Sequence, residues 1–227
     1  MRQAPTPEIS WKWKDAGTTL TALEQPALPA ERTMTHRIGY LIGSLAHDSI
    51  NRVLAKALVR LAPSSLELVE IPIRDLPLYN RDDELEPVAA VTDFKRAIEQ
   101  SEGLLLVSPE YNRSIPGALK NAIDWGSRPW GHNSFARKPT GIIGASTGAI
   151  GTAVMQSSMR SVLSFLNAPQ LNAPEAYITF DPEAFGDDGE VKDAGTEKFL
   201  RHYMSEYAAF VERVLSLTAP GHVGDQG

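Results

Sequence analysis

The chain has 227 residues, a formal net charge of −6 and 42% hydrophobic residues. This length fits one domain with or without tails, and the apolar content is enough for a sizeable core. The acidic balance argues against nucleic acid or an anionic membrane surface as a main partner.

The absence of cysteine excludes disulfides, thiol catalysis and iron–sulfur ligation, and it fits a cytoplasmic protein. No apolar run approaches the ~18 residues of a transmembrane helix, so we expect no membrane-spanning segment. The histidines show no metal-ligand spacing, so we expect no metal site.

The two ends of the chain differ from its middle. Residues 1–33 mix prolines with polar residues and keep no apolar period, so we expect a flexible extension there. Lysines beside Trp11 and Trp13 interrupt any apolar stretch of a secretory signal. Two alternatives stay open: Met34 is the true start, or the two tryptophans pack on a neighbouring subunit. We expect residues 34–217 to form the folded domain and residues 218–227 a disordered tail.

Between these ends, apolar stretches alternate with amphipathic ones. Strands are expected at about 37–42, 66–71, 103–108, 140–145 and 175–180, and helices at about 51–61, 87–100, 116–125, 151–166 and 195–217. The third strand is continuously apolar, which indicates burial on both faces. There is no internal repeat and no linker. The pattern therefore predicts one α/β domain, a doubly wound five-stranded parallel sheet with helices on both faces.

Three turns of this pattern are rich in serine, glycine and asparagine. They lie at 43–51, 109–115 and 146–150, after the first, third and fourth expected strands. Right-handed crossovers place such turns along one edge of a parallel sheet. Ligands bind at that edge, where the strand order reverses. We therefore expect the three turns to form a ligand site together.

The first of these turns precedes a helix start. Free N–H groups and the helix dipole at such a start favour an anion, usually a phosphate. Ser44, Ser49 and Asn51 add side-chain partners, with Ser49 or Asn51 as the N-cap. The alternative is a capped helix that binds nothing, because serine and asparagine are ordinary caps.

The other two turns suit a flat polar ligand. Tyr111 offers an aromatic face with a polar tip, and Asn112 offers donor and acceptor groups. A planar heteroaromatic ring with polar edges fits this pair. The alternative is a rigid turn in which Tyr111 covers apolar surface. The glycines of 146–152 allow close backbone approach, and the alternative there is a tight turn at a helix start.

Several nucleotide and hydrolase signatures are absent from the sequence. The first strand is not followed by G-x-G-x-x-G, which argues against a Rossmann-type dinucleotide fold. G-x-x-x-x-G-K-[ST] is also missing, which argues against a P-loop NTPase. No G-x-S-x-G elbow is present, which argues against an α/β-hydrolase.

Two blocks of sequence are more specific. They read PEYNRSIPGALKNAIDW at 109–125 and GASTGAIGT at 144–152, and the looser Gly-Ser-(five residues)-Asn turn at 43–51 precedes them in the matching place. Together they resemble the NADPH-dependent FMN reductase family, which is flavodoxin-like in fold, and within it the soluble quinone and chromate reductases. The resemblance covers about Arg37 to Phe180.

The resemblance implies one FMN per subunit. The phosphate would lie in the turn from Ser44 to Asn51, and the isoalloxazine ring against Pro109 to Arg113. The expected cofactor-binding residues are Ser44, Ser49, Ile50, Asn51, Pro109, Glu110, Tyr111, Asn112, Arg113, Ser146 and Gly148. The resemblance also implies NADPH or NADH as the reductant. It implies a homodimer or a dimer of dimers, with the helix from Pro116, which carries Asn121 and Asp124, as the contact element.

The first turn departs from the family pattern. Family members often carry basic residues and a glycine there, whereas this chain has Ala46, His47 and Asp48. A carboxylate ~5 Å from a phosphate costs roughly 1 kcal/mol or more at a partly exposed site. We therefore expect Asp48 to point away, toward Arg52. The missing basic pair argues against anionic acceptors such as chromate. A milder departure is Thr147, which replaces a common proline.

If FMN is bound, the flavin carries the chemistry. We expect hydride transfer from NAD(P)H to the flavin and then two-electron reduction of a planar acceptor such as a quinone or an azo compound. This ping-pong scheme needs no catalytic protein residue and no metal. Glu110 as a general base is disfavoured, because carboxylates in such turns often cap backbone N–H groups. Two aromatic residues, Tyr79 and Trp130, could cover the ring or fill a subunit interface.

Two other functions use the same fold. One is a flavodoxin-like carrier of single electrons. The other is a flavin reductase that supplies reduced FMN to a monooxygenase. The sequence does not distinguish NADH from NADPH, and it does not name the physiological acceptor.

Overall fold

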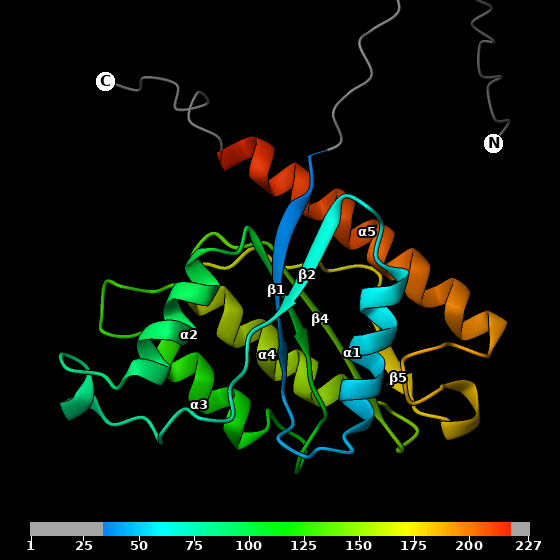
Figure 1. Ribbon diagram of the computed structural model, residues 1–227, viewed down its shortest axis with the longest axis horizontal. Coiled ribbons are helices and arrows are strands. Elements are labelled where there is room, and N and C mark those ends of the chain that lie inside the picture. Colours follow the sequence, from blue (N-terminus) through cyan, green and yellow to red (C-terminus); the bar gives the residue numbers. More distant parts are fainter. Residues whose placement is uncertain (1–33, 219–227) are drawn as a thin grey trace, which may run out of the picture. The chain divides into compact units, whose positions relative to one another are not determined.

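The structure is a computed structural model, and it describes residues 34–218 (Figure 1). The expected extension at 1–33 lies outside the described residues. So does the expected tail, apart from Thr218, which is the last residue of the C-terminal helix.

The described part of the chain forms one sheet of five parallel strands in the order β2-β1-β3-β4-β5. The strands are β1 (His36–Ile42), β2 (Leu66–Glu70), β3 (Gly103–Val107), β4 (Thr140–Ser146) and β5 (Tyr177–Thr179). The order reverses between β1 and β3, as a doubly wound sheet requires. The predicted fold class is therefore confirmed.

Five α-helices in residues 34–218 connect the strands or follow them. They are α1 (Ile50–Leu61), α2 (Ala89–Glu99), α3 (Gly117–Gly126), α4 (Ala153–Phe165) and α5 (Ala194–Thr218), and two short 3₁₀ helices lie at Arg81–Asp83 and Pro182–Ala184. Each α-helix begins and ends within two residues of its expected bounds. Pro87 was expected to open the second helix but lies ahead of α2, whose N-cap position is Val88.

The helices cover both faces of the sheet (Figure 1). Side chains alternate along β3, so Leu105 and Val107 join one core cluster while Leu104 and Leu106 join the other. The first cluster contains residues of α1 and α5, and the second contains residues of α2, α3 and α4. Every residue of β3 is buried, as its continuous apolarity predicted.

Two tyrosines fasten α5 to the middle of the sheet. The hydroxyl of Tyr203 donates to the Ile142 carbonyl oxygen at 2.9 Å, and that of Tyr207 donates to the Leu104 carbonyl oxygen at 2.7 Å. Both side chains are buried, and burial raises the pKa of each phenol above its usual value. The hydroxyls therefore stay protonated as donors. Because helices cover both faces of the sheet, the loops at its carboxyl edge are where a site can form.

Candidate functional site

Three turns lie together at the carboxyl edge of the sheet, the lower edge in Figure 1. They are the β1–α1 turn (residues 43–49), the β3–α3 turn (residues 108–116) and the β4–α4 turn (residues 147–152). The hydroxyls of Ser44 and Tyr111 lie 3.3 Å apart, which joins the first two turns directly. The three turns therefore meet at this edge of the sheet, as the sequence predicted.

Glycine makes this close approach possible around Ser108. A Cβ on Gly43 would lie 2.2 Å from the Ser108 hydroxyl oxygen, and a Cβ on Gly144 would lie 2.0 Å from the Ser108 carbonyl oxygen. Real side chains do not tolerate such contacts. The two positions that flank Ser108 in space therefore require residues without a Cβ.

The β1–α1 turn presents unpaired backbone donors. Ser49 is the N-cap of α1, and its hydroxyl accepts a hydrogen bond from the Asn51 N–H at 3.3 Å. Within residues 34–218, the N–H groups of His47, Asp48, Ser49 and Ile50 donate to no protein acceptor. Successive free N–H groups at the positive end of a helix dipole form a cradle for an anion such as phosphate. The donor set therefore fits the phosphate of FMN.

Asn51 has a different position from the one expected of a cofactor ligand. It is fully buried, and its side-chain amide binds the backbone of β4: Nδ2 donates to the Ala145 carbonyl oxygen at 2.9 Å, and Oδ1 accepts from the Ala145 N–H at 2.8 Å. Both polar atoms of the side chain are thus engaged across the sheet. The geometry makes Asn51 a residue that positions the β1–α1 turn.

The β3–α3 turn is a tight reversal that pushes its tip outward. Tyr111 and Ser114 exchange two backbone hydrogen bonds of 3.2 and 3.0 Å. The two residues between them, Asn112 and Arg113, have φ angles of 50° and 58°, as in a type I′ turn. Non-glycine residues rarely adopt this left-handed conformation, and such strain is often found at functional sites. The tip exposes the Tyr111 ring and the Asn112 amide, which has no protein partner within the described chain.

Glu110 binds the start of α4 from the β3–α3 turn. Its Oε2 accepts hydrogen bonds from the N–H groups of Val154 and Met155 at 2.9 Å each, and its Oε1 accepts one from Arg113 at 2.9 Å. Burial raises the pKa of this carboxyl, but the hydrogen bonds from Met155, Arg113 and Val154 outweigh burial and hold the pKa below its usual value. Glu110 is therefore a charged helix cap, as its position in the turn suggested, and is not placed to act as a general base.

The β4–α4 turn also leaves donors free. The Ser146 hydroxyl accepts from the Gly148 N–H at 3.1 Å, whereas the N–H groups of Ala149 and Ile150 have no acceptor among residues 34–218. Gly151 has φ +56°, and a Cβ there would lie 2.9 Å from the Tyr177 carbonyl carbon. This turn can therefore approach the polar edge of a planar ligand through its backbone.

Sequence reasoning missed Arg74, which lies after β2. Ile71 and Ile73 are buried, whereas Arg74 is exposed and lies in the turn at residues 74–75. Its guanidinium donates a hydrogen bond to the Leu45 carbonyl oxygen in the β1–α1 turn. The apolar residues Ile71 and Ile73 and the charged Arg74 were visible in the sequence. The contact of Arg74 with residue 45, however, depends on the order of the strands.

The expected pairing of Asp48 with Arg52 is wrong. Arg52 instead binds Glu70 at the end of β2, with distances of 3.0 and 3.1 Å from Nη1 to the two carboxylate oxygens. Asp48 is exposed. Pairing with Glu70 joins α1 to the end of β2, which local sequence spacing does not reveal.

Residues 36–183 match the family described as NADPH-dependent FMN reductase. The chain belongs to the NADPH-dependent FMN reductase family. A 2-hydroxy-1,4-benzoquinone reductase of Burkholderia sp is 45% identical over 178 residues, covering 78% of this chain and 97% of that protein. A quinone reductase of Escherichia coli (strain K12) is 40% identical over 182 residues, covering 77% and 94%. The solved structure of FerB, a flavoenzyme NAD(P)H:(acceptor) oxidoreductase from Paracoccus denitrificans, has 40% identity and a TM-score of 0.76, and the match covers 79% of this chain and 98% of that one.

Membership of this family makes the chain an FMN-dependent oxidoreductase that uses NAD(P)H. No helix in the described part of the chain combines the length and apolarity that a membrane crossing needs. The three turns are consistent with FMN on chemical grounds, because they combine free backbone donors, an exposed aromatic face and an unpaired amide.

The two aromatic residues considered as covers of the ring or as interface residues lie beside aromatic side chains of α3 and α4 in this chain. Tyr79 packs edge-on against Trp125 of α3, with ring centroids 5.2 Å apart. Trp130 is 77% exposed and lies 6.4 Å from the ring of Phe165, the last residue of α4. Glu110 binds the other end of that helix, about 16 Å away at 1.5 Å per residue. Trp130 therefore does not cover the three turns of its own chain.

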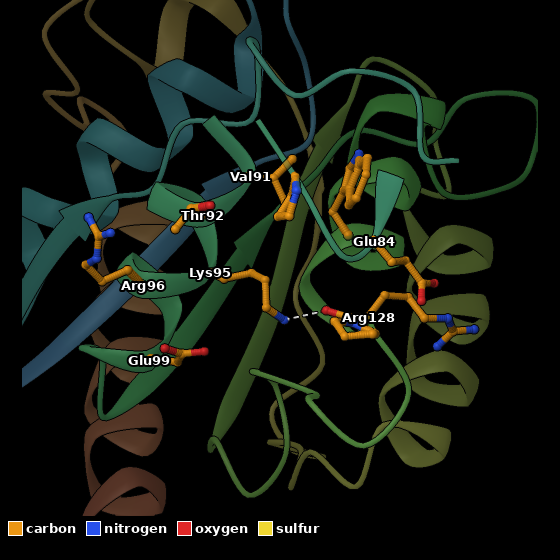
Figure 2. Close-up of a pocket in the computed structure, with 10 residues that line it drawn as sticks. Glu84, Val91, Thr92, Lys95, Arg96, Glu99 and Arg128 are labelled. Carbon is orange, nitrogen blue, oxygen red and sulfur yellow. Dashed lines mark hydrogen bonds between the residues drawn. The ribbon is translucent and has the colours of Figure 1, made fainter. Parts of the chain in front are cut away.

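A separate hollow of about 270 Å³ lies between α2 and the end of α3 (Figure 2). Lys95 points into it and donates to the carbonyl oxygens of Gly126, Arg128 and His132 at 3.1, 2.7 and 2.8 Å. These contacts use all three donors of the ammonium. Burial also lowers the pKa of Lys95. Lys95 therefore fastens residues 126–132 to α2 and presents no free donor to a ligand.

Replacing Asn51 by alanine tests its positioning role. Asn51→Ala leaves the buried N–H and carbonyl of Ala145 without partners, so we expect the free energy of unfolding to fall by about 2–4 kcal/mol. Urea unfolding at pH 7 measures the change. The matched control is Gln100→Ala, which removes an exposed amide without a partner in the described chain at a residue with φ −72°, and should stay within about 0.5 kcal/mol of the wild type. Equal unfolding curves for the two variants would contradict the positioning role.

Replacing Glu110 by glutamine tests the charged cap. At pH 7 we expect Glu110→Gln to lower the free energy of unfolding by about 1–2 kcal/mol, because the charge bound by two helix N–H groups and Arg113 is lost. A carboxyl whose pKa is depressed by folding contributes stability above its unfolded-state pKa of about 4.5 and loses that contribution as the pH falls through its folded-state pKa.

The difference between wild type and Glu110→Gln should therefore be constant from pH 7 to about pH 5.5 and shrink toward pH 4 and below. Urea midpoints across this range measure it. Glu86→Gln, at an exposed position, is the control and should show no such pH-dependent difference. A difference that grows as the pH falls would contradict the charged cap.

Proposed function

We propose that this chain is a two-electron NAD(P)H:quinone oxidoreductase in which the three turns at the carboxyl edge of the sheet bind one FMN. The observation that carries the proposal is the convergence of unpaired backbone donors from two turns on the side of the sheet where the third turn exposes Tyr111 and Asn112. Residues 34–217 constitute the FMN-binding reductase domain in this proposal.

The β1–α1 turn supplies the phosphate end of the proposed site. Ser44, Ser49 and Ile50 contribute hydroxyl or backbone groups there, and Asn51 keeps the turn in place through Ala145. The free N–H groups of residues 47–50 support this assignment, because a phosphate is the anion that best matches several converging amides.

The β3–α3 turn supplies the ring end. Pro109, Glu110, Tyr111, Asn112 and Arg113 form one rigid unit, because Glu110 binds both Arg113 and the start of α4. Ser146 and Gly148 face the same edge from the third turn. Tyr111 and Asn112 are then free to contact a flat ligand by stacking and by hydrogen bonding.

Bound FMN would accept a hydride from NAD(P)H and deliver two electrons to the acceptor in a second half-reaction. The protein positions the ligands and keeps its own carboxylate out of the reaction, because Glu110 is committed to α4. A planar, uncharged acceptor is favoured, because the relatives are named for quinones and the acidic Asp48 in the β1–α1 turn does not attract an anion such as chromate.

We also propose that the protein is a cytoplasmic homodimer or dimer of dimers. Exposed apolar side chains on the segment before α2 support an interface, since Leu78, Leu85 and Val88 are 86%, 89% and 56% exposed. The side chain of Asn121 in α3 does not contribute an unpaired group to such an interface, because it binds the backbone of Tyr79 and Pro77. The absence of cysteine supports the location.

Anaerobic spectroscopy of the purified, FMN-loaded protein tests the proposed reaction. We expect a yellow protein that keeps FMN through gel filtration, is bleached by NADPH or NADH, and is restored by 1,4-benzoquinone without oxygen. Running both nucleotides in parallel determines the preferred reductant, and omitting the quinone gives the control.

Two results would contradict this function in different ways. Bleaching without reoxidation by quinone, together with loss of FMN on the column, would indicate a flavin reductase that supplies a monooxygenase. An FMN-bound protein that neither nucleotide bleaches would indicate an electron carrier.

A further inference from the structure

We propose that Arg74, from the segment after β2, supplies the positive charge for the phosphate of FMN that the β1–α1 turn itself lacks. The inference rests on the proposed placement of FMN and extends it to a residue outside the three turns. Arg74 would make the site selective for FMN over riboflavin, which has the same ring but no phosphate.

The charge of the β1–α1 turn motivates this inference. Residues 43–51 contain no lysine or arginine and carry one acidic residue, Asp48. The phosphate of FMN carries a charge of about −1.5 to −2 at pH 7, whereas a helix start contributes only about +0.5. The turn by itself therefore leaves most of the phosphate charge unbalanced. A cation from elsewhere in the fold would offset part of the remaining charge.

Arg74 is placed to provide that cation. It is the only lysine or arginine in residues 34–218 whose side chain donates to a residue of the β1–α1 turn, through the Leu45 carbonyl oxygen. The neighbouring cation, Arg52, is already bound by both carboxylate oxygens of Glu70. A hollow of about 210 Å³ has Ser44, Leu45, Arg52 and Arg74 in its lining.

The backbone holds Arg74 at this place before any ligand arrives. Ile71 continues the sheet beyond β2, since its N–H donates to the Tyr40 carbonyl oxygen at 2.9 Å, and the side chains of Ile71 and Ile73 are buried. The contact with Leu45 uses part of a five-donor guanidinium, and no other partner of Arg74 exists in the described residues. Its remaining N–H groups are available for phosphate oxygens, to which a guanidinium binds in a fork.

Two acidic residues lie near Arg74, and their negative charges reduce the positive potential around it. Glu70 lines the same hollow but is paired with Arg52, and Asp75 lines it as the next residue in the chain. Neither forms an ion pair with Arg74 among the described residues. The guanidinium therefore keeps its charge free for a ligand.

Flavin titrations of apoprotein separate this role from a structural one. Wild type, Arg74→Gln and Arg74→Lys are stripped of flavin and titrated with FMN and with riboflavin at about 50 and 300 mM NaCl, following the quenching of flavin fluorescence. Arg81→Gln is the matched control, because Arg81 is an exposed arginine farther along the same connection. Urea unfolding checks that each variant is folded, and steady-state assays of the FMN-loaded proteins give the KM for NADPH and for NADH.

We expect Arg74→Gln to weaken FMN binding about 10- to 50-fold at low salt while riboflavin binding changes less than about two-fold. The loss should be smaller at high salt, because screening already weakens the wild-type interaction. Arg74→Lys should fall between wild type and Arg74→Gln, since it keeps the charge without the fork. Arg81→Gln should match the wild type with both flavins.

Three results would overturn the inference. Equal losses for FMN and riboflavin would show a structural role only. Unchanged FMN affinity with a raised KM for NADPH, but not for NADH, would show that Arg74 serves the 2′-phosphate of the nucleotide instead. Unchanged affinity and kinetics would show no role. A wild-type protein that binds neither flavin would instead contradict the proposed function itself, and this inference with it.

Discussion

The pair of hydrogen bonds between the Asn51 amide and the backbone of Ala145 is the constraint on which the rest of the site depends. It joins the first turn of α1 to the end of β4, although β3 lies between β1 and β4 in the sheet. Both ends are buried, so breaking the pair would leave polar groups without water or protein partners. The orientation of the free N–H groups at residues 47–50 is fixed relative to the β4–α4 turn by this contact.

A second link of the same kind fixes the remaining turn. Glu110 binds the N–H groups that begin α4, so the β3–α3 turn and the β4–α4 turn form one unit. Asn51 and Glu110, polar side chains of the kind that often act in catalysis, are thus engaged in holding backbone segments together. What remains for a ligand is backbone N–H groups, one aromatic face and one amide. This set suits a cofactor that brings its own reactivity, as FMN does.

The sequence predicted the fold well because the signals are local. The apolar run of β3 and the amphipathic periods of the helices are properties of short segments, and chain order with right-handed crossovers then determines where the turns meet. The same reasoning found the three turns. It did not find how they are joined, because Asn51 and Ala145 are 94 residues apart and the amide could equally have capped α1. Ser49 takes that role instead.

The errors and omissions have the same cause. Arg52 was expected to pair with Asp48 nearby in sequence, but the order of β1 and β2 brings Glu70 closer. Arg74 was overlooked for the same reason, since its contact with Leu45 joins the connections that follow two neighbouring strands. Trp130, for which a ring cover and an interface position were both open, lies beside Phe165 at the far end of α4 and away from the three turns of its own chain.

Amide hydrogen exchange with and without FMN tests most directly whether the three turns bind one cofactor together. The account predicts that FMN slows exchange in peptides covering residues 43–50, 109–114 and 146–152 at the same time, and leaves the hollow lined by α2 and the end of α3 unchanged. Protection confined to residues 84–99 and 125–132, or to only one of the three turns, would contradict it.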